Sequence, residues 1–178
     1  MANVVVLLRI GVIVAITSPG IFRDLYVVLA AGVTLGVAVV MPQLYRVLGS
    51  RPLTAPKFTN PTNLSVSLSF GVAYALIPLA SAWLTERIGN TGLFAFSFIP
   101  GLTDVDAIML SSAKLAGSGR ISVQDAITAI VIAVMANTLL KVFMIVFIGG
   151  VELAKRTIPG LLGSTAGVLI GLGYFRIV

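Results

Sequence analysis

The sequence predicts an all-α, polytopic membrane protein with about six transmembrane segments, organised as a single membrane domain over residues 1–178. Of the 178 residues, 58% are hydrophobic and 10% are charged, whereas about 25% of a typical soluble domain is charged. The mean hydropathy is +1.09. The chain divides into apolar stretches close to the roughly 20 residues that a spanning helix needs, and no separate soluble domain fits between them.

The charged residues exclude several partners and chemistries. The net charge is +6, but the 12 lysines and arginines are scattered singly, with no basic stripe that could follow the phosphates of a nucleic acid. Such scattering is typical of the loops of a membrane protein, so the predicted partner is the lipid bilayer and not nucleic acid. The chain contains no cysteine and no histidine, which excludes disulfides, thiol chemistry and imidazole proton relays.

Two helices and a polar loop are predicted for the first part of the chain. The spans cover residues 4–22, ending at the breaker Ser18-Pro19-Gly20, and residues 25–48, with Arg23-Asp24 as the turn between them. The first run has no convincing signal-peptide cleavage site, so we expect it to be retained as a helix. Residues 49–63 form the longest polar loop and divide the chain into two parts.

Four further segments follow this loop. A span is expected over residues 64–85, a broken segment over 92–117, a helix over 122–150 and a last span over 158–177. The broken segment contains Pro100-Gly101, where we predict that the helix is interrupted. Ser122 is a predicted N-cap, because Asp125 follows it at the spacing of a capping box.

The orientation depends on whether segment 92–117 crosses the membrane or returns as a re-entrant hairpin. Cytoplasmic loops are enriched in lysine and arginine. A crossing segment gives a small excess of these residues on one side, whereas a returning one gives equal numbers on both sides. The rule therefore favours crossing, with both termini on the cytoplasmic side.

A weak internal repeat relates residues 5–40 to residues 139–172. In this alignment Arg9 matches Lys141 and Arg23 matches Lys155, so each copy has a helix with an embedded cation followed by a basic turn. Chance similarity between apolar helices is the alternative explanation. Duplicated halves are common in transport folds, where sites lie near the midplane at broken helices.

The repeat predicts a partial first copy over residues 1–48 and a second copy over 64–178 that includes the broken helix. The two copies are parallel if segment 92–117 crosses and inverted if it is re-entrant. Because the first copy has no counterpart of residues 64–117, we expect a fragment, a split gene product or a subunit that another chain completes. Glycines at small-xxx-small spacing predict close helix packing; these are Gly32, Gly36, Gly163, Gly167 and Gly171.

The predicted site lies just after Pro100-Gly101, where Thr103, Asp104 and Asp106 interrupt an apolar segment. An ionised acid in a membrane usually faces a bundle interior or a wet cavity. Residues two apart on a helix point in different directions, so one acid is expected to cap the following helix while the other faces a partner or a cation. Carboxylates and freed carbonyl oxygens suit a hard cation such as magnesium or sodium, which makes Asp104 and Asp106 the candidate metal ligands.

Polar residues on the next helix complete the predicted site. Asn137 and Lys141 are four residues apart and share one helical face, with Thr138 beside them. We predict a buried pair between Lys141 and one of the two acids, either as a structural ion pair or as a functional coupling site. Arg9 is expected to reach toward the membrane surface, as long basic side chains near a terminus do.

Ser111, Ser112 and Lys114 follow the acidic motif. We expect the two serines to donate hydrogen bonds back to their own helix, as hydroxyls in apolar helices commonly do. Lys114 is expected at the membrane surface.

The string from Gly101 to Ile108, followed by Ser111 and by Ala136-Asn137-Thr138-Leu139-Leu140-Lys141, resembles an uncharacterised bacterial membrane domain, domain of unknown function 4010. That domain often follows an MgtC/SapB-type domain in a longer protein, a portion not recognisable here. The resemblance is clearest from about Asn60 onward. It implies functional roles for Asp104, Asp106, Asn137 and Lys141, a magnesium-related transport context and a location in the bacterial inner membrane.

Together these features predict a transporter or channel component for a cation or small solute, with a midplane site at the broken helix. The alternative is a non-transporting membrane subunit that scaffolds or regulates a partner. An intramembrane aspartyl hydrolase is disfavoured because both acids lie on one segment, so no enzyme activity is expected. No cofactor is predicted beyond a bound cation, and a homo-oligomer, with a dimer favoured, is expected from the glycine motifs.

Overall fold

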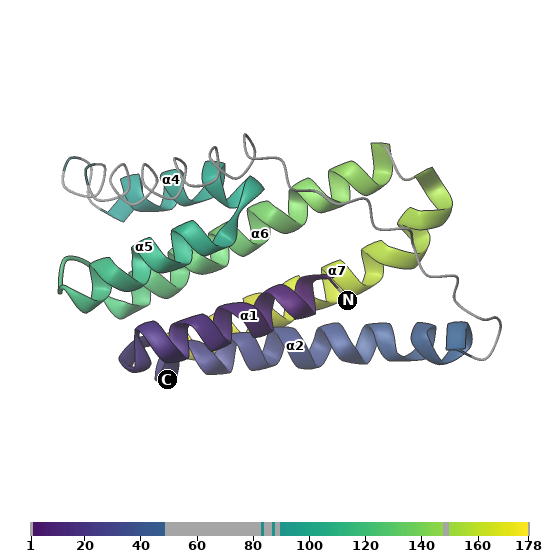
Figure 1. The fold of residues 1–178 in the computed structure, drawn as a ribbon, viewed down its shortest axis with the longest axis horizontal. Coiled ribbons are helices and arrows are strands. Elements are labelled where there is room, and N and C mark those ends of the chain that lie inside the picture. Colours follow the sequence, from purple (N-terminus) through teal and green to yellow (C-terminus); the bar gives the residue numbers. More distant parts are fainter. Residues whose placement is uncertain (1, 49–82, 84–86, 88–89, 148–149, 178) are drawn as a thin grey trace, which may run out of the picture.

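The computed structural model describes residues 2–48, 83, 87, 90–147 and 150–177, and this part of the chain is helical, with no strand (Figure 1). The helices are α1 (Ala2–Thr17), α2 (Pro19–Leu48), α4 (Asn90–Thr103), α5 (Val105–Gly117), α6 (Val123–Phe147) and α7 (Gly150–Ile177). Three stretches are long and apolar enough to cross a membrane: Pro19–Pro42, Val123–Phe147 and Leu153–Ile177. The predicted helical membrane fold is confirmed.

Some predicted elements differ from the structure or lie outside the described residues. The turn between α1 and α2 falls at Ser18 and not at Arg23-Asp24, which lie within α2. Proline is favoured at the first position of a helix, and the Ser18 carbonyl accepts hydrogen bonds from the N–H groups of Ile21 and Phe22. The polar loop 49–63 lies outside the described residues, as does the span at 64–85 apart from Trp83.

The predicted start of α6 is confirmed. The Ser122 hydroxyl accepts a hydrogen bond from the N–H of Asp125 at 3.0 Å and donates one to the Asp125 carboxylate at 2.6 Å. This exchange fixes the first turn of α6. Gly119, with a φ of 72°, makes the turn that separates α5 from α6.

Helices α4 and α5 fold back on each other as a hairpin (Figure 1). Leu93, near the start of α4, and Leu115, near the end of α5, share a buried cluster with Ala129 of α6. At the other end of α4, Gly101 lies against Ala133, farther along α6. The turn of the hairpin therefore lies beside the middle of α6, and both arms extend toward the start of α6.

The described parts of the two arms are each shorter than a bilayer core. At 1.5 Å per residue, α4 and α5 reach about 21 and 20 Å, less than the ~30 Å of a bilayer core. The hairpin thus has the shape of the re-entrant alternative for segment 92–117, whereas the charge rule favoured a crossing segment. The charge rule had little power here because the two arrangements differ by few charges.

The direction of each helix follows from contacts at the glycines of α2. A Cβ added at either of two of these glycines would meet both α1 and α7. At Gly32 the nearest atoms belong to Val168 and Leu7, and at Gly36 they belong to Ser164 and Val4. From Gly32 to Gly36 the residue numbers increase along α2, whereas those of the facing residues decrease along α1 and along α7. Hence α1 and α7 are parallel to each other and antiparallel to α2.

The two copies of the repeat consequently run in opposite directions. Thr138 of α6 is hydrogen-bonded to Thr165, and Thr128 to Arg176, so α6 is antiparallel to α7 and to α1. The pair α1–α2 is inverted relative to the pair α6–α7. In Figure 1, α1 and α7 both run from right to left, and the C-terminal end lies farther left than the N-terminal end. The prediction that both termini are cytoplasmic assumed a crossing segment and is not supported by this arrangement.

A glycine seam joins α2 to α7 and consists of Gly32, Gly36, Gly163, Gly167 and Gly171. A Cβ added at any of them would approach an atom of the facing helix within 3.0 Å. Because glycine has no side chain, the two backbones can lie this close. The seam is used inside the chain and so no longer supports contact between two copies.

Candidate functional site

The site is built around the turn of the α4–α5 hairpin, and the helix break there is displaced from its predicted position. α4 continues through Pro100 and Gly101, so the predicted break at this pair is wrong. The carbonyl oxygen of Pro100 accepts a helical hydrogen bond from the N–H of Asp104 at 2.9 Å. A Cβ at Gly101 would lie 2.6 Å from the Cα of Ala133. An interior proline removes its own N–H donor and crowds the carbonyl four residues earlier, which can bend a helix without ending it. The packing of Gly101 on α6 is compatible with a continuous helix.

The break occurs at Asp104, and the two acids have different roles. Asp104 has extended backbone angles of φ −148° and ψ 123°, and its carboxylate accepts a hydrogen bond from the N–H of Asp106 at 3.0 Å. It is the N-cap of α5. Asp106 forms an ion pair with Arg9 of α1, with 2.8 Å between Nη2 and Oδ1. One acid thus caps a helix while the other faces a partner, as the sequence predicted.

The basic partner differs from the predicted one. Lys141 donates its hydrogen bond to Oδ1 of Asn3 at 3.0 Å and makes no ion pair among the described residues. Arg9 occupies the place predicted for Lys141 because α1 contacts α5 directly. A cation embedded in an apolar helix needs a counter-charge, and that principle could have identified Arg9.

A chain of hydrogen bonds extends the site from Lys141 across three helices. The amide nitrogen of Asn3 donates to the hydroxyl of Thr138 at 2.7 Å, and the hydroxyl of Thr165 donates to the same oxygen at 3.4 Å. Asn3 was missed from the sequence. It lies on the buried stripe of α1 together with Leu7, which was the signal that could have found it.

Asn137 ties α6 to the hairpin. Its amide nitrogen donates to the carbonyl oxygen of Leu102 at 3.3 Å. This bond satisfies a carbonyl in the last turn of α4, where helical partners run out. Thr103 is the last residue of α4. Of the predicted site residues, Asn137 therefore holds the turn, while Thr138 and Lys141 belong to the neighbouring hydrogen-bond chain.

The residues around the turn do not fit the predicted metal site. Among the described residues there is no group of three or more acids that could hold a metal ion. Asp104 is engaged as a cap, and the Asp106 carboxylate faces a guanidinium that would repel a divalent cation. Magnesium is bound through one or two carboxylates and several waters, and both carboxylates here are already engaged. With Arg9 paired to Asp106, the turn therefore does not fit a resident metal ion, and a cation could reach the carboxylate only by displacing the arginine.

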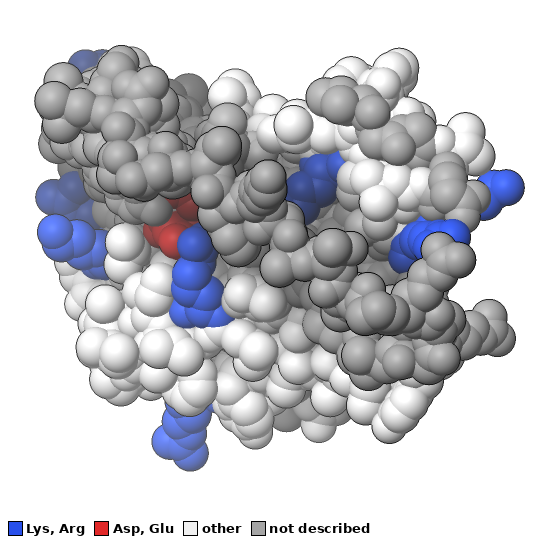
Figure 2. Space-filling view, turned by 45° about the vertical axis from the view of Figure 1, so that its right-hand side comes forward, with Lys and Arg blue, Asp and Glu red and all other residues white. Residues whose placement is uncertain are grey.

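The ion pair is unequally buried. The side chain of Asp106 is 12% exposed and that of Arg9 is 51% exposed. Figure 2 shows one face on which red acidic atoms lie against blue basic atoms, while most of the surrounding described surface is white. The acid is held in place by the hairpin, whereas the arginine has room to move.

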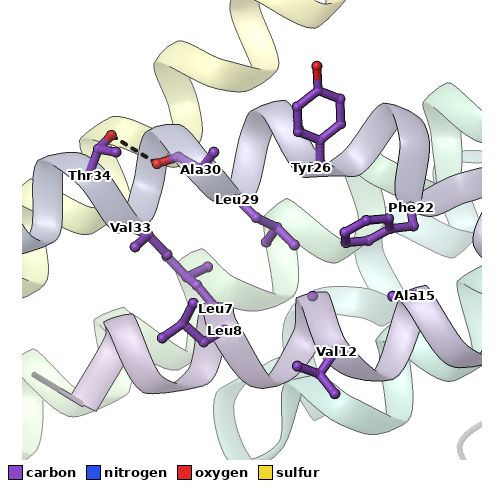
Figure 3. Close-up of a pocket in the computed structure, with 11 residues that line it drawn as sticks. Leu7, Leu8, Val12, Ala15, Phe22, Tyr26, Leu29, Ala30, Val33 and Thr34 are labelled. Atoms are coloured by element: carbon purple, nitrogen blue, oxygen red, sulfur yellow. Dashed lines mark hydrogen bonds between the residues drawn. The ribbon is translucent and has the colours of Figure 1, made fainter.

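A separate hollow of about 470 Å³ lies between α1 and α2 (Figure 3). Its lining is almost entirely apolar and includes Leu8, Val12 and Phe22. The hydroxyl of Thr34 is occupied by a hydrogen bond to the carbonyl of Ala30 at 2.8 Å. Such a lining offers little to orient a polar solute, so the ion pair and not this groove is the candidate site.

The fold and site define a helical membrane protein with two inverted helix pairs and a half-length hairpin. The chain belongs to the family described as Domain of unknown function (DUF4010), whose model matches residues 1–149. The match includes α1 and α2, farther toward the N-terminus than the clearest resemblance in the sequence.

An uncharacterized protein of Aquifex aeolicus (strain VF5) is 40% identical over 82 residues. This stretch is 46% of the present chain and 36% of that protein, so the similarity spans about a third of the relative. No solved structure matches the chain.

Proposed function

We propose that the protein is a membrane transporter, or a component of one, that moves a cation or a small charged solute. The observation that carries this proposal is the placement of the Arg9–Asp106 ion pair at the turn of a half-length hairpin, beside the middle of a membrane-length helix. Inverted helix pairs around broken helices are a recurring design of secondary transporters. The DUF4010 family itself has no assigned activity.

In this proposal the ion pair is the group that exchanges partners. A cation binds by replacing Arg9 at the Asp106 carboxylate, and an anionic solute binds by replacing Asp106 at the guanidinium. Arg9 can move because half of its side chain is exposed, whereas Asp106 is fixed in the first turn of α5. Lys141 and Asn3 then supply a second charge and a hydrogen-bonding group beside the exchanging pair.

A scaffolding or regulatory subunit is the second candidate, and the closed state of the ion pair favours it. At 2.8 Å the two charges satisfy each other, which is also how a purely structural link between α1 and α5 is built. In both proposals the protein is non-enzymatic and resides in the bacterial inner membrane. A homodimer and a magnesium-related substrate remain predictions of the sequence.

Flux measurements on reconstituted protein test the proposal. The wild-type chain is placed in liposomes that contain fluorescent indicators for magnesium or sodium, and currents from small carboxylates and amines are recorded on supported membranes. The variants are Asp106→Asn, Arg9→Gln and Lys141→Met. Lys155→Met is the matched control, because Lys155 is exposed and lies far along the chain from the site.

We expect flux of at least one probe in the wild type and in Lys155→Met, and a strong reduction in Asp106→Asn and Arg9→Gln. A folded wild type that moves none of the probes contradicts transport. If, in addition, Asp106→Asn fails to assemble with a co-purifying membrane protein that the wild type retains, the scaffold is supported instead.

A further inference from the structure

Two serines of α5 depart from the behaviour of the other helical hydroxyls nearby. The hydroxyls of Thr17, Ser97, Thr128 and Thr138 each donate to the carbonyl four residues earlier. Ser111 and Ser112 are both buried. The Ser112 hydroxyl has no partner among the described residues, so the expectation that it bonds back to its helix is wrong. For Ser111 the described residues likewise include no such bond. A buried hydroxyl without a hydrogen-bond partner lowers the stability of the folded state.

Ser111 lines a hollow of about 390 Å³ between α5 and the turn that joins α1 to α2. Lys114 is three residues later on the same face of α5, and it lines the hollow as well. Thr17 and Ser18 line it from the opposite side. Four polar side chains from distant parts of the sequence thus line one space together with Leu110 and Ala113.

The charge of this hollow is positive. No acid is among its described lining residues, and Lys114 forms no ion pair within the described part of the chain. Ser111 is only 3% exposed, and its hydroxyl makes no hydrogen bond to another described residue. A lysine with adjacent hydroxyl donors is the chemistry that binds a phosphate group.

The hollow also lies beside one end of a membrane-length helix. The membrane-length stretch of α2 begins at Pro19, directly after Ser18. Thr17 and Ser18 are therefore at the end of a spanning segment. Lysine side chains at such positions commonly reach the headgroup region.

We propose that the hollow formed by Thr17, Ser18, Ser111 and Lys114 is a binding site for a phosphate group, supplied by an anionic lipid headgroup or by a free phosphate. Lys114 neutralises the charge of the phosphate. Ser111 donates the hydrogen bond that it does not make to another described residue. The site is separate from the Arg9–Asp106 pair and does not depend on the transport proposal.

Binding to the purified chain in detergent tests this site. The probes are dihexanoylphosphatidylglycerol and inorganic phosphate, with dihexanoylglycerol, which lacks phosphate, as the negative control. The variants are Ser111→Ala and Lys114→Gln. Ser112→Ala is the matched control for the serine, because Ser112 also lacks a partner but does not line the hollow. Lys155→Gln is the control for the lysine.

We expect affinity to fall about tenfold or more in Ser111→Ala and in Lys114→Gln, the loss that follows removal of one hydrogen bond to a charged group. The control variants keep wild-type affinity. Binding of the lipid alone supports a headgroup site, and binding of inorganic phosphate as well supports a site for the phosphate group from either source.

The proposal is overturned if neither phosphate probe binds, if dihexanoylglycerol binds as well as the phospholipid, or if Ser112→Ala weakens binding as much as Ser111→Ala. Circular dichroism and size-exclusion chromatography establish that each variant is folded. Lys114 is exposed, so Lys114→Gln tests the site even if Ser111→Ala disturbs packing.

Discussion

Replacing Gly167 by alanine should destabilise the bundle through one identifiable contact. An added Cβ would meet the backbone of α2, with the carbonyl oxygen of Ala31 nearest and the Cα of Gly32 at 2.8 Å. Backbone atoms of a packed helix cannot turn aside as a side chain can. Overpacking of this kind costs about 1–3 kcal/mol, and the contact with two backbone groups places Gly167→Ala toward the upper end of that range.

Gly173→Ala is the matched control on the same helix, because an added Cβ there would meet nothing within 4 Å. Both substitutions gain up to about 1 kcal/mol of helix propensity. That gain cancels when the two variants are compared, so the difference between their free energies of unfolding is the packing cost itself.

The assay is equilibrium unfolding in mixed micelles, followed by circular dichroism. We expect Gly167→Ala to unfold about 1–3 kcal/mol more easily than Gly173→Ala. Equal free energies of unfolding would refute the argument that the glycine seam holds α2 against α7.

Three further predictions concern the hairpin and its ion pair. Asp106→Asn should lower the free energy of unfolding by about 1–2 kcal/mol, less than the roughly 3–5 kcal/mol of a fully buried pair, because the Arg9 side chain is 51% exposed. The double variant with Arg9→Met should recover part of this loss. Additive effects in the double-mutant cycle would show that the two side chains do not interact. Asp104→Ala should lower the free energy of unfolding by about 1 kcal/mol through loss of the N-cap of α5, whereas Asp104→Asn should lower it little because asparagine also caps helices. Equal decreases for the two variants, measured by chemical unfolding, would contradict the capping role. Gly101→Ala should displace the hairpin from Ala133 and raise the hydrogen-exchange rate of the α4 amides. Gly117→Ala should leave that rate unchanged, because a Cβ added at Gly117 would meet no atom within 4 Å. An unchanged exchange rate in Gly101→Ala would argue against the close contact with Ala133.

The helical elements could be predicted largely from composition and capping residues. Ser122 and Asp125 marked the start of α6 because a capping box acts through neighbouring residues. Local signals were less useful at Pro100, where the sequence predicted a break and the structure has a helix. A proline weakens a helix locally, but the contact of Gly101 with Ala133 depends on a residue more than thirty positions away.

In the candidate site, too, local sequence signals identified the residues but not the contacts between distant parts of the chain. Asp104, Asp106, Asn137 and Lys141 were marked by their polarity in apolar segments, and all four lie near the hairpin turn or in the hydrogen-bond chain beside it. The sequence assigned the wrong cation to Asp106. Which of two embedded cations meets an acid depends on how three helices are placed in space, and spacing along the chain carries no such information.

By itself the sequence determined that this chain is a helical membrane protein of the DUF4010 family with charged groups inside its apolar segments. Those properties follow from residue type and local spacing, since several apolar stretches of about 20 residues indicate spanning helices and a charge embedded in them needs a partner. Only the tertiary structure decided that segment 92–117 turns back, that the two helix pairs are inverted and that Arg9 pairs with Asp106. These outcomes depend on contacts between residues far apart in the chain, which form only when the helices pack together.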